Sequence, residues 1–185
     1  MRKNLGNKPL IYPQPVLVIG TYDGAGNPDA MTAAWGSVGD DTQVFLCLSK
    51  EHKTTENILK SGCFTVSIGT RDTLVACDYV GIDSANKVVD KIRKAGLTPV
   101  RSEQVSAPYF EELPLALFCT LISYEPEHCH LFGEIVGTSV DEKILTDGKI
   151  DPAKLQAIAF GIGDNSYLLA AEKVGDAFRD GLKLR

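Results

Sequence analysis

The chain has 185 residues and a mass of 20.0 kDa, which is enough for one domain with a sizeable buried core. Its composition, 44% hydrophobic and 23% charged, excludes a disordered, collagen-like or disulfide-stapled chain. A formal net charge of -5 argues against a protein that binds nucleic acid by neutralising the phosphate backbone. We therefore expect a soluble globular protein with no nucleic-acid partner.

Cysteine spacing and apolar runs bear on the cellular compartment. The five cysteines include no CxxC pair, which fits neither a disulfide framework nor a zinc ribbon. Pro13 and Gln14 break the apolar stretch near the N-terminus, so it does not resemble a signal peptide. The longest apolar runs, such as residues 113–122, are shorter than the roughly 20 residues that span a bilayer. The sequence predicts reduced thiols, a cytoplasmic location and no membrane insertion.

The first half of the chain alternates short apolar runs with turn residues, as strands of a sheet do. Residues 15–22 and 30–38 flank a Gly/Asn/Pro/Asp cluster and predict a hairpin. Within that cluster Gly24-Ala25-Gly26 begins like a dinucleotide fingerprint, but Asp29 replaces its third glycine. A turn that needs glycine for positive φ is the better interpretation. Residues 43–48 and 63–68 predict two further strands.

Three helices are expected between and after these strands. The first covers residues 52–61, with Thr54 or Thr55 as N-cap and Gly62 as its end. The second covers residues 71–79 and is capped by Asp72, and the third covers residues 84–95.

Strands are expected again at residues 113–124 and 130–140, separated by a turn. Asp151 followed by Pro152 is typical of a helix start and leads into residues 154–159. The order of elements predicts a mainly β, mostly antiparallel barrel with peripheral helices.

Residues 49–57, the anion-binding segment, join a strand end to a helix start. They bring together two lysines, a histidine, three hydroxyls and free backbone N–H groups. A helix N-terminus with nearby cations favours a bound phosphate. The alternative is a solvated cap and turn.

Residues 27–35 place small side chains before the only tryptophan, Trp35. Small residues let a flat ligand approach the main chain, whose N–H and C=O groups can then bind the edge of an aromatic heterocycle. Tight packing of a strand with Trp35 in the core would produce the same pattern.

His128-Cys129-His130 places two imidazoles on one face of an extended strand, a spacing that can chelate a metal. A metal would need a third protein ligand, and the remaining histidine, His52, belongs to the anion-binding segment. A structural or surface role and a substrate-facing His128 are the alternatives, and we predict no metal site.

Five segments in this order, NPDAMTAAWGSV, VFLCLSKEHKTTENI, CFTVSI, CDYVGIDSANKVVDKI and HCHLFGEIV, resemble the flavin reductase-like family, and within it the flavoredoxins. The resemblance implies the FMN-binding split barrel, an antiparallel Greek-key β-barrel with peripheral helices, as a single domain over residues 1–185. It also implies a homodimer with FMN near the subunit interface. Relatives commonly carry Ser-Gly after a Tyr-x-Gly segment, whereas this chain has Ser84-Ala85 after Tyr79-Val80-Gly81.

The resemblance also implies site residues. The isoalloxazine ring would be lined by Met31, Thr32, Ala33, Ala34 and Trp35. The ribityl phosphate would be held by Ser49, Lys50, His52, Lys53, Thr54 and Thr55, with Asn57 supporting that loop. His128 would lie near the nicotinamide of NAD(P)H.

The resulting expectation is an FMN-binding oxidoreductase that transfers electrons between NAD(P)H or a redox protein and flavin. Two alternatives stay open. One is a flavin-carrying electron-transfer protein without its own NAD(P)H reductase activity, and the other is a non-redox split barrel that binds another ligand.

Overall fold

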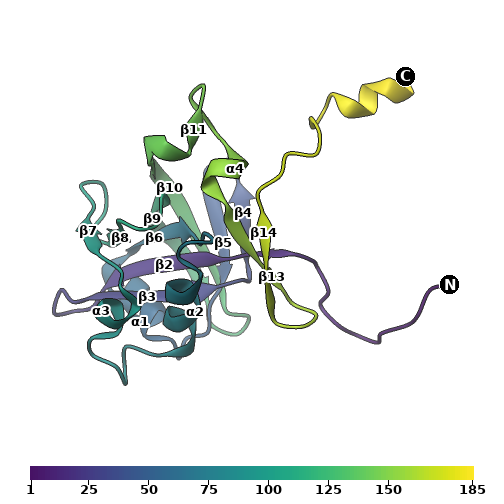
Figure 1. The fold of residues 1–185 in the computed structure, drawn as a ribbon. Helices are drawn as coiled ribbons and strands as arrows, with labels where there is room; N and C mark the ends of the chain where they lie inside the picture. Colours follow the sequence, from purple (N-terminus) through teal and green to yellow (C-terminus); the bar gives the residue numbers. More distant parts are fainter.

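A curled antiparallel sheet of seven strands forms the body of the molecule (Figure 1). The computed structural model describes residues 1–185. In spatial order the strands are β3 (Pro28–Ala33), β2 (Leu17–Tyr22), β6 (Cys63–Ile68), β9 (Leu115–Glu125), β10 (His130–Val140), β5 (Gln43–Cys47) and β4 (Gly36–Asp40). Strands β3 and β4 follow each other in the chain yet form opposite edges of this sheet. The architecture is mainly β and antiparallel, as the order of elements predicted, and it is the split β-barrel that the resemblance implied.

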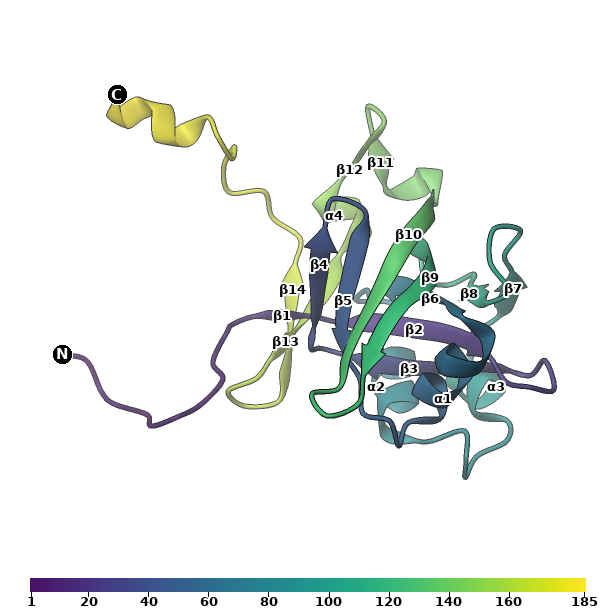
Figure 2. The same cartoon turned by 180° about the vertical axis from the view of Figure 1, so that it is seen from behind.

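Smaller elements surround the barrel (Figures 1 and 2). A three-stranded sheet joins β1 (Gln14–Pro15), β13 (Ala157–Gly161) and β14 (Ser166–Ala170). Two hairpin-like pairs are β7 (Pro99–Arg101) with β8 (Pro108–Phe110), and β11 (Leu145–Thr146) with β12 (Lys149–Ile150). The α-helices are α1 (Lys53–Ser61), α2 (Leu74–Ile82), α3 (Lys91–Ala95) and α4 (Pro152–Leu155). Short 3-10 helices are Glu142–Ile144 and Asp180–Leu184.

Strand β2 is buried on both faces, which explains its continuous apolar run. Leu17 and Ile19 point into the barrel interior, where they pack with a cluster that includes Leu46 and Phe64. Val18, which points to the other face, packs with residues of α2, α3 and β13. Such two-sided burial removes the alternation of polar and apolar residues that marks a half-exposed strand. The helices therefore cover the outside of β2 and β3.

Several predictions are confirmed in detail. Strands β6 and β10 have the predicted bounds. The β2–β3 turn contains Gly26 at φ 83°, and α1 ends at Gly62, which adopts the left-handed conformation with φ 70°. The side chain of Asp151 accepts a hydrogen bond from the backbone N–H of Ala153 and so caps α4.

Two predictions in the first half are wrong. The single strand expected at residues 30–38 is two strands, because the chain bends at Ala34 and Trp35 to leave one edge of the sheet for the other. The N-cap of α1 is His52 rather than Thr54 or Thr55. Thr54 and Thr55 are the second and third residues of the helix and are buried against the barrel.

The expected second and third helices also differ. Helix α2 begins at Leu74 after Thr73, so Asp72 lies outside it and does not cap it. Of residues 84–95 only Lys91–Ala95 are helical, and the apolar side chain of Val89 is 99% exposed. Residues 84–90 form turns instead.

The helix expected at residues 154–159 is wrong beyond Leu155. It stops at Gln156, which has φ 49°, because the following residues pair with β14 as strand β13. Backbone pairing with a distant segment outweighs the local helix preference. No helix is long and apolar enough to cross a membrane.

Candidate functional site

A cleft runs between the barrel and the helices that cover β3. Its first part, the apolar pocket, has a volume of about 350 Å³. It is lined by Val16, Met31, Thr32, Ala33, Ala34, Trp35, Cys47, Leu48, His52, Gly81, Phe160 and Tyr167. All five residues that the sequence placed against a ring system, residues 31–35, therefore line one pocket.

Helix α2 forms the opposite wall of the apolar pocket. The hydroxyl of Thr32 donates a hydrogen bond to the carbonyl of Cys77 at 2.5 Å. Gly81 approaches so closely that an added Cβ would lie 3.2 Å from the Cβ of Thr32. A glycine at this position therefore lets α2 pack directly on β3.

Aromatic side chains from β13 and β14 complete the apolar pocket. Phe160 and Tyr167 meet edge to face, with ring centroids 6.3 Å apart. The Tyr167 hydroxyl donates a hydrogen bond to Asp78 Oδ1 at 2.7 Å. Burial and this contact with a carboxylate raise the pKa of Tyr167, so the hydroxyl stays protonated. The interaction ties β14 to α2 across the pocket.

The second part of the cleft, the polar pocket, has a volume of about 170 Å³. It adjoins the apolar pocket, since Met31, His52 and Gly81 line both. Its other lining residues are Asp29, Lys53, Thr54, Val80, Ile82, Asp83, Ser84, Ala85 and Lys91. Helix α1 begins here, and no side chain caps its first turn. Uncapped N–H groups and the positive end of the helix dipole favour an anion.

A buried ion pair forms the base of the polar pocket. The Lys91 ammonium lies 3.5 Å from Asp29 Oδ1 and donates a hydrogen bond to the carbonyl of Ala30 at 2.6 Å. Thr54 donates to Asp29 Oδ2 at 2.7 Å. Burial lowers the pKa of Lys91, and the nearby carboxylate of Asp29 opposes this effect. Lys91 thus places a positive charge away from bulk water.

The remaining cations of the anion-binding segment differ in their placement. Lys53 lines the polar pocket and pairs with Glu56 at 3.3 Å. Lys50 is exposed and lines neither pocket. Ser49 also lines neither and donates a hydrogen bond to Glu51. The geometry therefore favours Lys53 over Lys50 as the cation next to a bound anion.

Two buried polar side chains of α1 lie behind the pocket. Thr55 is fully buried, and its hydroxyl has no hydrogen-bond partner. Asn57 donates to the hydroxyl of Thr21 at 3.1 Å, while its carbonyl oxygen is unpartnered. Such orphaned atoms are uncommon in folded proteins and cost stability unless a partner is supplied. Asn57 links α1 to β2, in agreement with a supporting role.

The cleft suits a ligand with a flat apolar end and an anionic end. Small residues and aromatic rings line one part, and a helix N-terminus with Lys53 and Lys91 lines the other. FMN has this form, because its isoalloxazine ring is planar and its phosphate is anionic. The residues present therefore fit FMN.

Comparison with known proteins identifies the family of this chain. The model of the flavin reductase like domain matches residues 10–153. The chain belongs to the flavin reductase-like family. It is similar to flavoredoxin of Desulfovibrio vulgaris (Miyazaki F), with 37% identity, 98% of this chain and 100% of that chain covered, and a TM-score of 0.93.

Two further relatives extend this flavin reductase-like group. Flavoredoxin from Methanosarcina acetivorans is 26% identical, with both chains covered fully and a TM-score of 0.88. An uncharacterized protein of Aquifex aeolicus (strain VF5) is 26% identical over 147 residues, covering 75% of this chain and 74% of its own. Family membership and these matches support a flavin-binding redox role.

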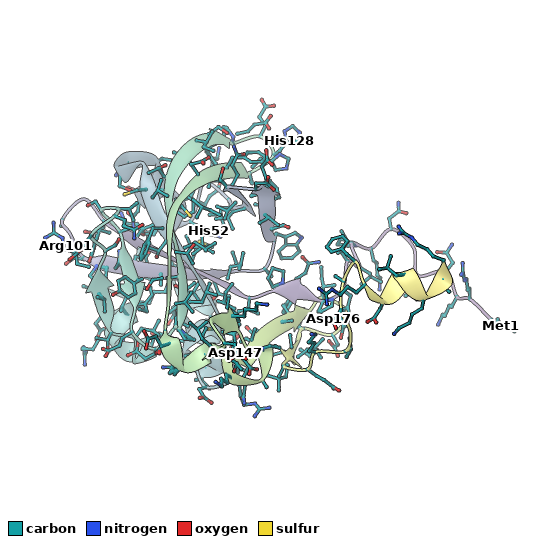
Figure 3. All side chains as sticks on the ribbon, turned by 90° about the horizontal axis from the view of Figure 1, so that it is seen from above. Met1, His52, Arg101, His128, Asp147 and Asp176 are labelled. Atoms are coloured by element: carbon teal, nitrogen blue, oxygen red, sulfur yellow. The ribbon has the colours of Figure 1, made fainter.

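The histidine pair of this flavin reductase-like protein lies at the turn between β9 and β10. Figure 3 shows His128 at the edge of the molecule, whereas His52 lies over the body. Cys129 has φ 59°, so residues 128–130 are not extended, which was the condition for placing both imidazoles on one face of a strand. The two imidazoles nevertheless stack, with centroids 5.6 Å apart. His128 is not among the residues lining either pocket, and its donor-site role stays a prediction.

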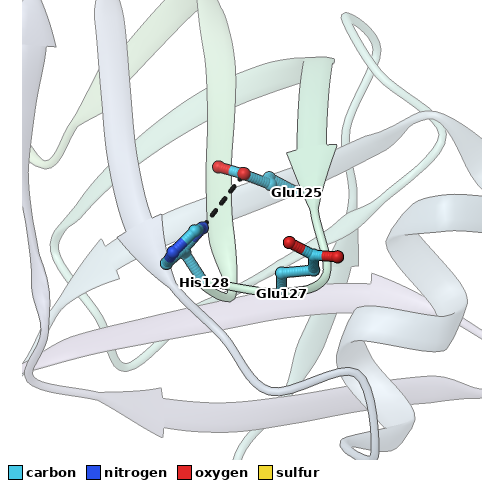
Figure 4. Close-up of side chains that lie close together, drawn as sticks. All are labelled: Glu125, Glu127 and His128. Atoms are coloured by element: carbon cyan, nitrogen blue, oxygen red, sulfur yellow. Dashed lines mark hydrogen bonds and ion pairs between the residues drawn. The ribbon is translucent and has the colours of Figure 1, made fainter.

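Acidic side chains surround His128. Its Nδ1 lies 3.0 Å from Glu125 Oε1, and Glu127 lies close by (Figure 4). One ligand atom from each of these three residues lies within 4.8 Å of the others. All three side chains are exposed, as is common for acidic groups that bind no ion. His130, in turn, pairs in register with Cys47, which lines the apolar pocket.

Sequence reasoning missed several lining residues, chiefly Lys91, Phe160 and Tyr167. Lys91 follows a non-helical stretch that was predicted to be helix, and the two aromatics belong to strands that were not predicted. The resemblance to the family indicated the segment containing Lys91 but not which of its side chains turns inward. Only the tertiary fold brings these residues to β3.

Proposed function

We propose that this protein is an FMN-binding oxidoreductase, with electrons supplied by NAD(P)H or by a redox protein. The observation that carries the proposal is the continuity of the cleft, which leads from the small residues of β3 to the uncapped start of α1 beside Lys53 and Lys91. Family membership and the similarity to flavoredoxins support it.

FMN, when bound, supplies the redox chemistry, while the protein binds and orients it. Residues 31–35 offer backbone groups and small side chains along the ring. Phe160 and Tyr167 line the same apolar pocket and would restrict water there, and the Tyr167–Asp78 hydrogen bond holds that wall in place. Lys53, Lys91 and the N–H groups of α1 would hold the phosphate. Trp35, 51% exposed at the pocket, leaves one side open to an electron donor.

A second candidate is a flavin-carrying electron-transfer protein that does not oxidise NAD(P)H. The similarity to two flavoredoxins over nearly the whole chain favours it. Both candidates require bound FMN, so they differ only in the donor.

One experiment tests the cofactor and then the donor. The purified protein should be yellow and should release FMN on denaturation. A colourless protein that fails to quench the fluorescence of added FMN at micromolar concentration would sink both candidates. Anaerobic bleaching by NADH or NADPH at catalytic rates supports the reductase. Slow bleaching by both nucleotides, with rapid reduction by an iron-sulfur or haem donor, supports the carrier.

A further inference from the structure

The turn between β9 and β10 gathers four side chains that can bind a metal ion. They are Glu125, Glu127, His128 and His130, all within six consecutive residues. One ligand atom each from Glu125, Glu127 and His128 lies within 4.8 Å of the others (Figure 4). No lysine or arginine pairs with either carboxylate, and the ion pairs of Glu125 are those with the two histidines. The turn therefore combines two imidazoles with two carboxylates that no cation neutralises.

The distances within this cluster suit ligands of a single metal ion. His128 Nδ1 lies 3.0 Å from Glu125 Oε1, and His130 Nδ1 lies 3.7 Å from Glu125 Oε2. Zinc binds nitrogen and oxygen atoms at about 2.0 to 2.2 Å, so two ligand atoms on a tetrahedral zinc lie about 3.4 Å apart. The two distances in the turn fall on either side of this value. Small rotations of these exposed side chains would therefore complete the coordination.

The backbone of the turn holds the two histidines side by side. Cys129, between them, has φ 59°, in the left-handed region that few residues other than glycine adopt. On a regular strand His128 and His130 would lie about 6.5 to 7 Å apart. Here the imidazoles stack, with ring centroids 5.6 Å apart. With Cys129 in this conformation, both imidazoles lie beside the carboxylate of Glu125.

The donor set indicates which metal the turn would bind. Imidazole nitrogen suits zinc, copper, iron and nickel, whereas magnesium and calcium prefer oxygen ligands. Two imidazoles and two carboxylates make four ligands, the number that zinc takes in a closed tetrahedral site. The sequence-based expectation of no metal site rested on the lack of a third protein ligand. The folded turn supplies Glu125 and Glu127.

Two hydrogen bonds join this turn to the apolar pocket. The Cys47 thiol donates to the carbonyl of His128 at 3.8 Å, and the backbone N–H of Leu48 donates to the carbonyl of Cys129 at 2.8 Å. Cys47 and Leu48 both line the pocket. A metal ion that fixes the turn would therefore also restrain the pocket wall at the end of β5.

We propose that Glu125, Glu127, His128 and His130 form a zinc site that fastens the β9–β10 turn at the edge of the cleft. The two carboxylates balance the charge of the ion, and the two neutral imidazoles complete its coordination. Because every ligand belongs to one turn, the site needs no second copy of the chain and no bound FMN. Zinc at Nδ1 of His128 leaves Nε2 free to contact an electron donor, so the two roles of this histidine are compatible.

Calorimetric titration with zinc chloride, on flavin-free protein prepared without a polyhistidine tag, tests the site. The wild type should bind one zinc ion per chain. Loss of a ligand should weaken zinc at least as much as loss of an outer-shell partner, about 10- to 100-fold. His128→Ala, His130→Ala and Glu125→Gln should each have this effect. His52→Ala and Glu142→Gln are the matched controls and should leave zinc affinity unchanged, because they remove an imidazole and an exposed carboxylate outside the turn.

Wild-type protein that binds no zinc, or that binds zinc no more tightly than His128→Ala does, would overturn the proposal. An equal loss of affinity in His52→Ala would overturn it as well, since it would place the ion elsewhere.

Two further measurements locate the ion and its effect. Cobalt(II) in place of zinc should give the intense visible bands of a four-coordinate ion, whereas the weak bands of a six-coordinate ion would contradict the ligand set. Zinc should slow amide hydrogen exchange at residues 126–131 and at Leu48, whose N–H is bound to the turn. Slower exchange only outside these residues would overturn the proposal. Because every readout uses flavin-free protein, its failure is distinguishable from a failure to bind FMN.

Discussion

Lys53 allows phosphate binding to be separated from ring binding. Lys53→Met should weaken FMN by about 10- to 150-fold, the loss of a charge-assisted contact of about 1.5 to 3 kcal/mol. Riboflavin, which lacks the phosphate, should bind almost as before. Fluorescence titration with both ligands measures the difference. Lys60→Met is the control, because Lys60 pairs with the same Glu56 but lies outside the polar pocket. Equal weakening of both ligands by Lys53→Met would assign Lys53 to the fold.

The buried ion pair of Lys91 and Asp29 makes a contribution to stability that depends on pH. Lys91→Met leaves Asp29 buried without its cation, which should destabilise the protein by about 3 to 5 kcal/mol, and adding Asp29→Asn should restore much of this. The pKa of Lys91 is lowered from 10.5 by burial. The unfolded chain therefore keeps the Lys91 proton up to a higher pH than the folded protein does. As the pH rises through the folded pKa toward 10.5, the contribution of Lys91 to stability should increase.

Urea unfolding of the wild type and of the double variant, measured across this range, isolates the Lys91 contribution to stability. A difference between the two proteins that does not change up to pH 10.5 would contradict the shifted pKa.

His128 is expected to contact the electron donor rather than FMN. His128→Ala should raise the apparent KM for NAD(P)H and leave FMN affinity nearly unchanged, and His130→Ala should do less to the KM. Steady-state kinetics with NAD(P)H and fluorescence titration with FMN measure the two quantities. Unchanged reduction kinetics in His128→Ala would leave the exposed turn with only a surface role. A larger effect of His130→Ala would fit its register opposite Cys47.

At the scale of secondary-structure elements, the Tyr167–Asp78 hydrogen bond joins β14 to α2 across the apolar pocket. Tyr167→Phe should cost about 1.5 to 3 kcal/mol, as for a hydrogen bond to a charged group. Because the pKa of Tyr167 is raised, this contribution is complete below the unfolded value of 10 and is lost as the pH rises further.

Denaturant unfolding at pH 7 and pH 11 measures the Tyr167 contribution. Tyr109→Phe is the control, since the Tyr109 hydroxyl has no hydrogen-bond partner in the structure. A Tyr167→Phe variant as stable as the wild type at pH 7 would show that packing with Phe160 alone holds β14.

At the scale of the whole molecule, the cleft is built from β3, α1, α2, α3, β13 and β14, so a ligand that fills it bridges most of the fold. FMN at a concentration 100 times its dissociation constant should add about 2.7 kcal/mol to the free energy of unfolding. Thermal unfolding with FMN, with riboflavin at the same concentration and without ligand measures this effect. Riboflavin should stabilise less than FMN. Removal of FMN that leaves the melting temperature unchanged would contradict binding at this cleft.

The parts of the site that lie close together in sequence could be predicted from it. Residues 31–35 and 52–54 line one cleft, and both segments could be singled out because a strand with small residues and a strand-to-helix junction are local patterns. Lys91, Phe160 and Tyr167 could not be found in this way, because their place in the cleft depends on long-range packing. The expected helix at residues 84–95 failed for the same reason, since residues 84–90 are not helical and Ser84 and Ala85 line the polar pocket instead.

The sequence by itself determined the β class, the bounds of β6 and β10 and the end of α1 at Gly62, and it singled out residues 49–57 as a candidate anion-binding segment. These features depend on alternation, turn residues and caps, whose effects are local in the chain. Only the tertiary structure decided that the predicted strand at residues 30–38 divides between two sheet edges and that Lys91 is buried beside Asp29. Pairing and burial between segments far apart in sequence outweigh local preference, and no local pattern encodes which distant partner a segment meets.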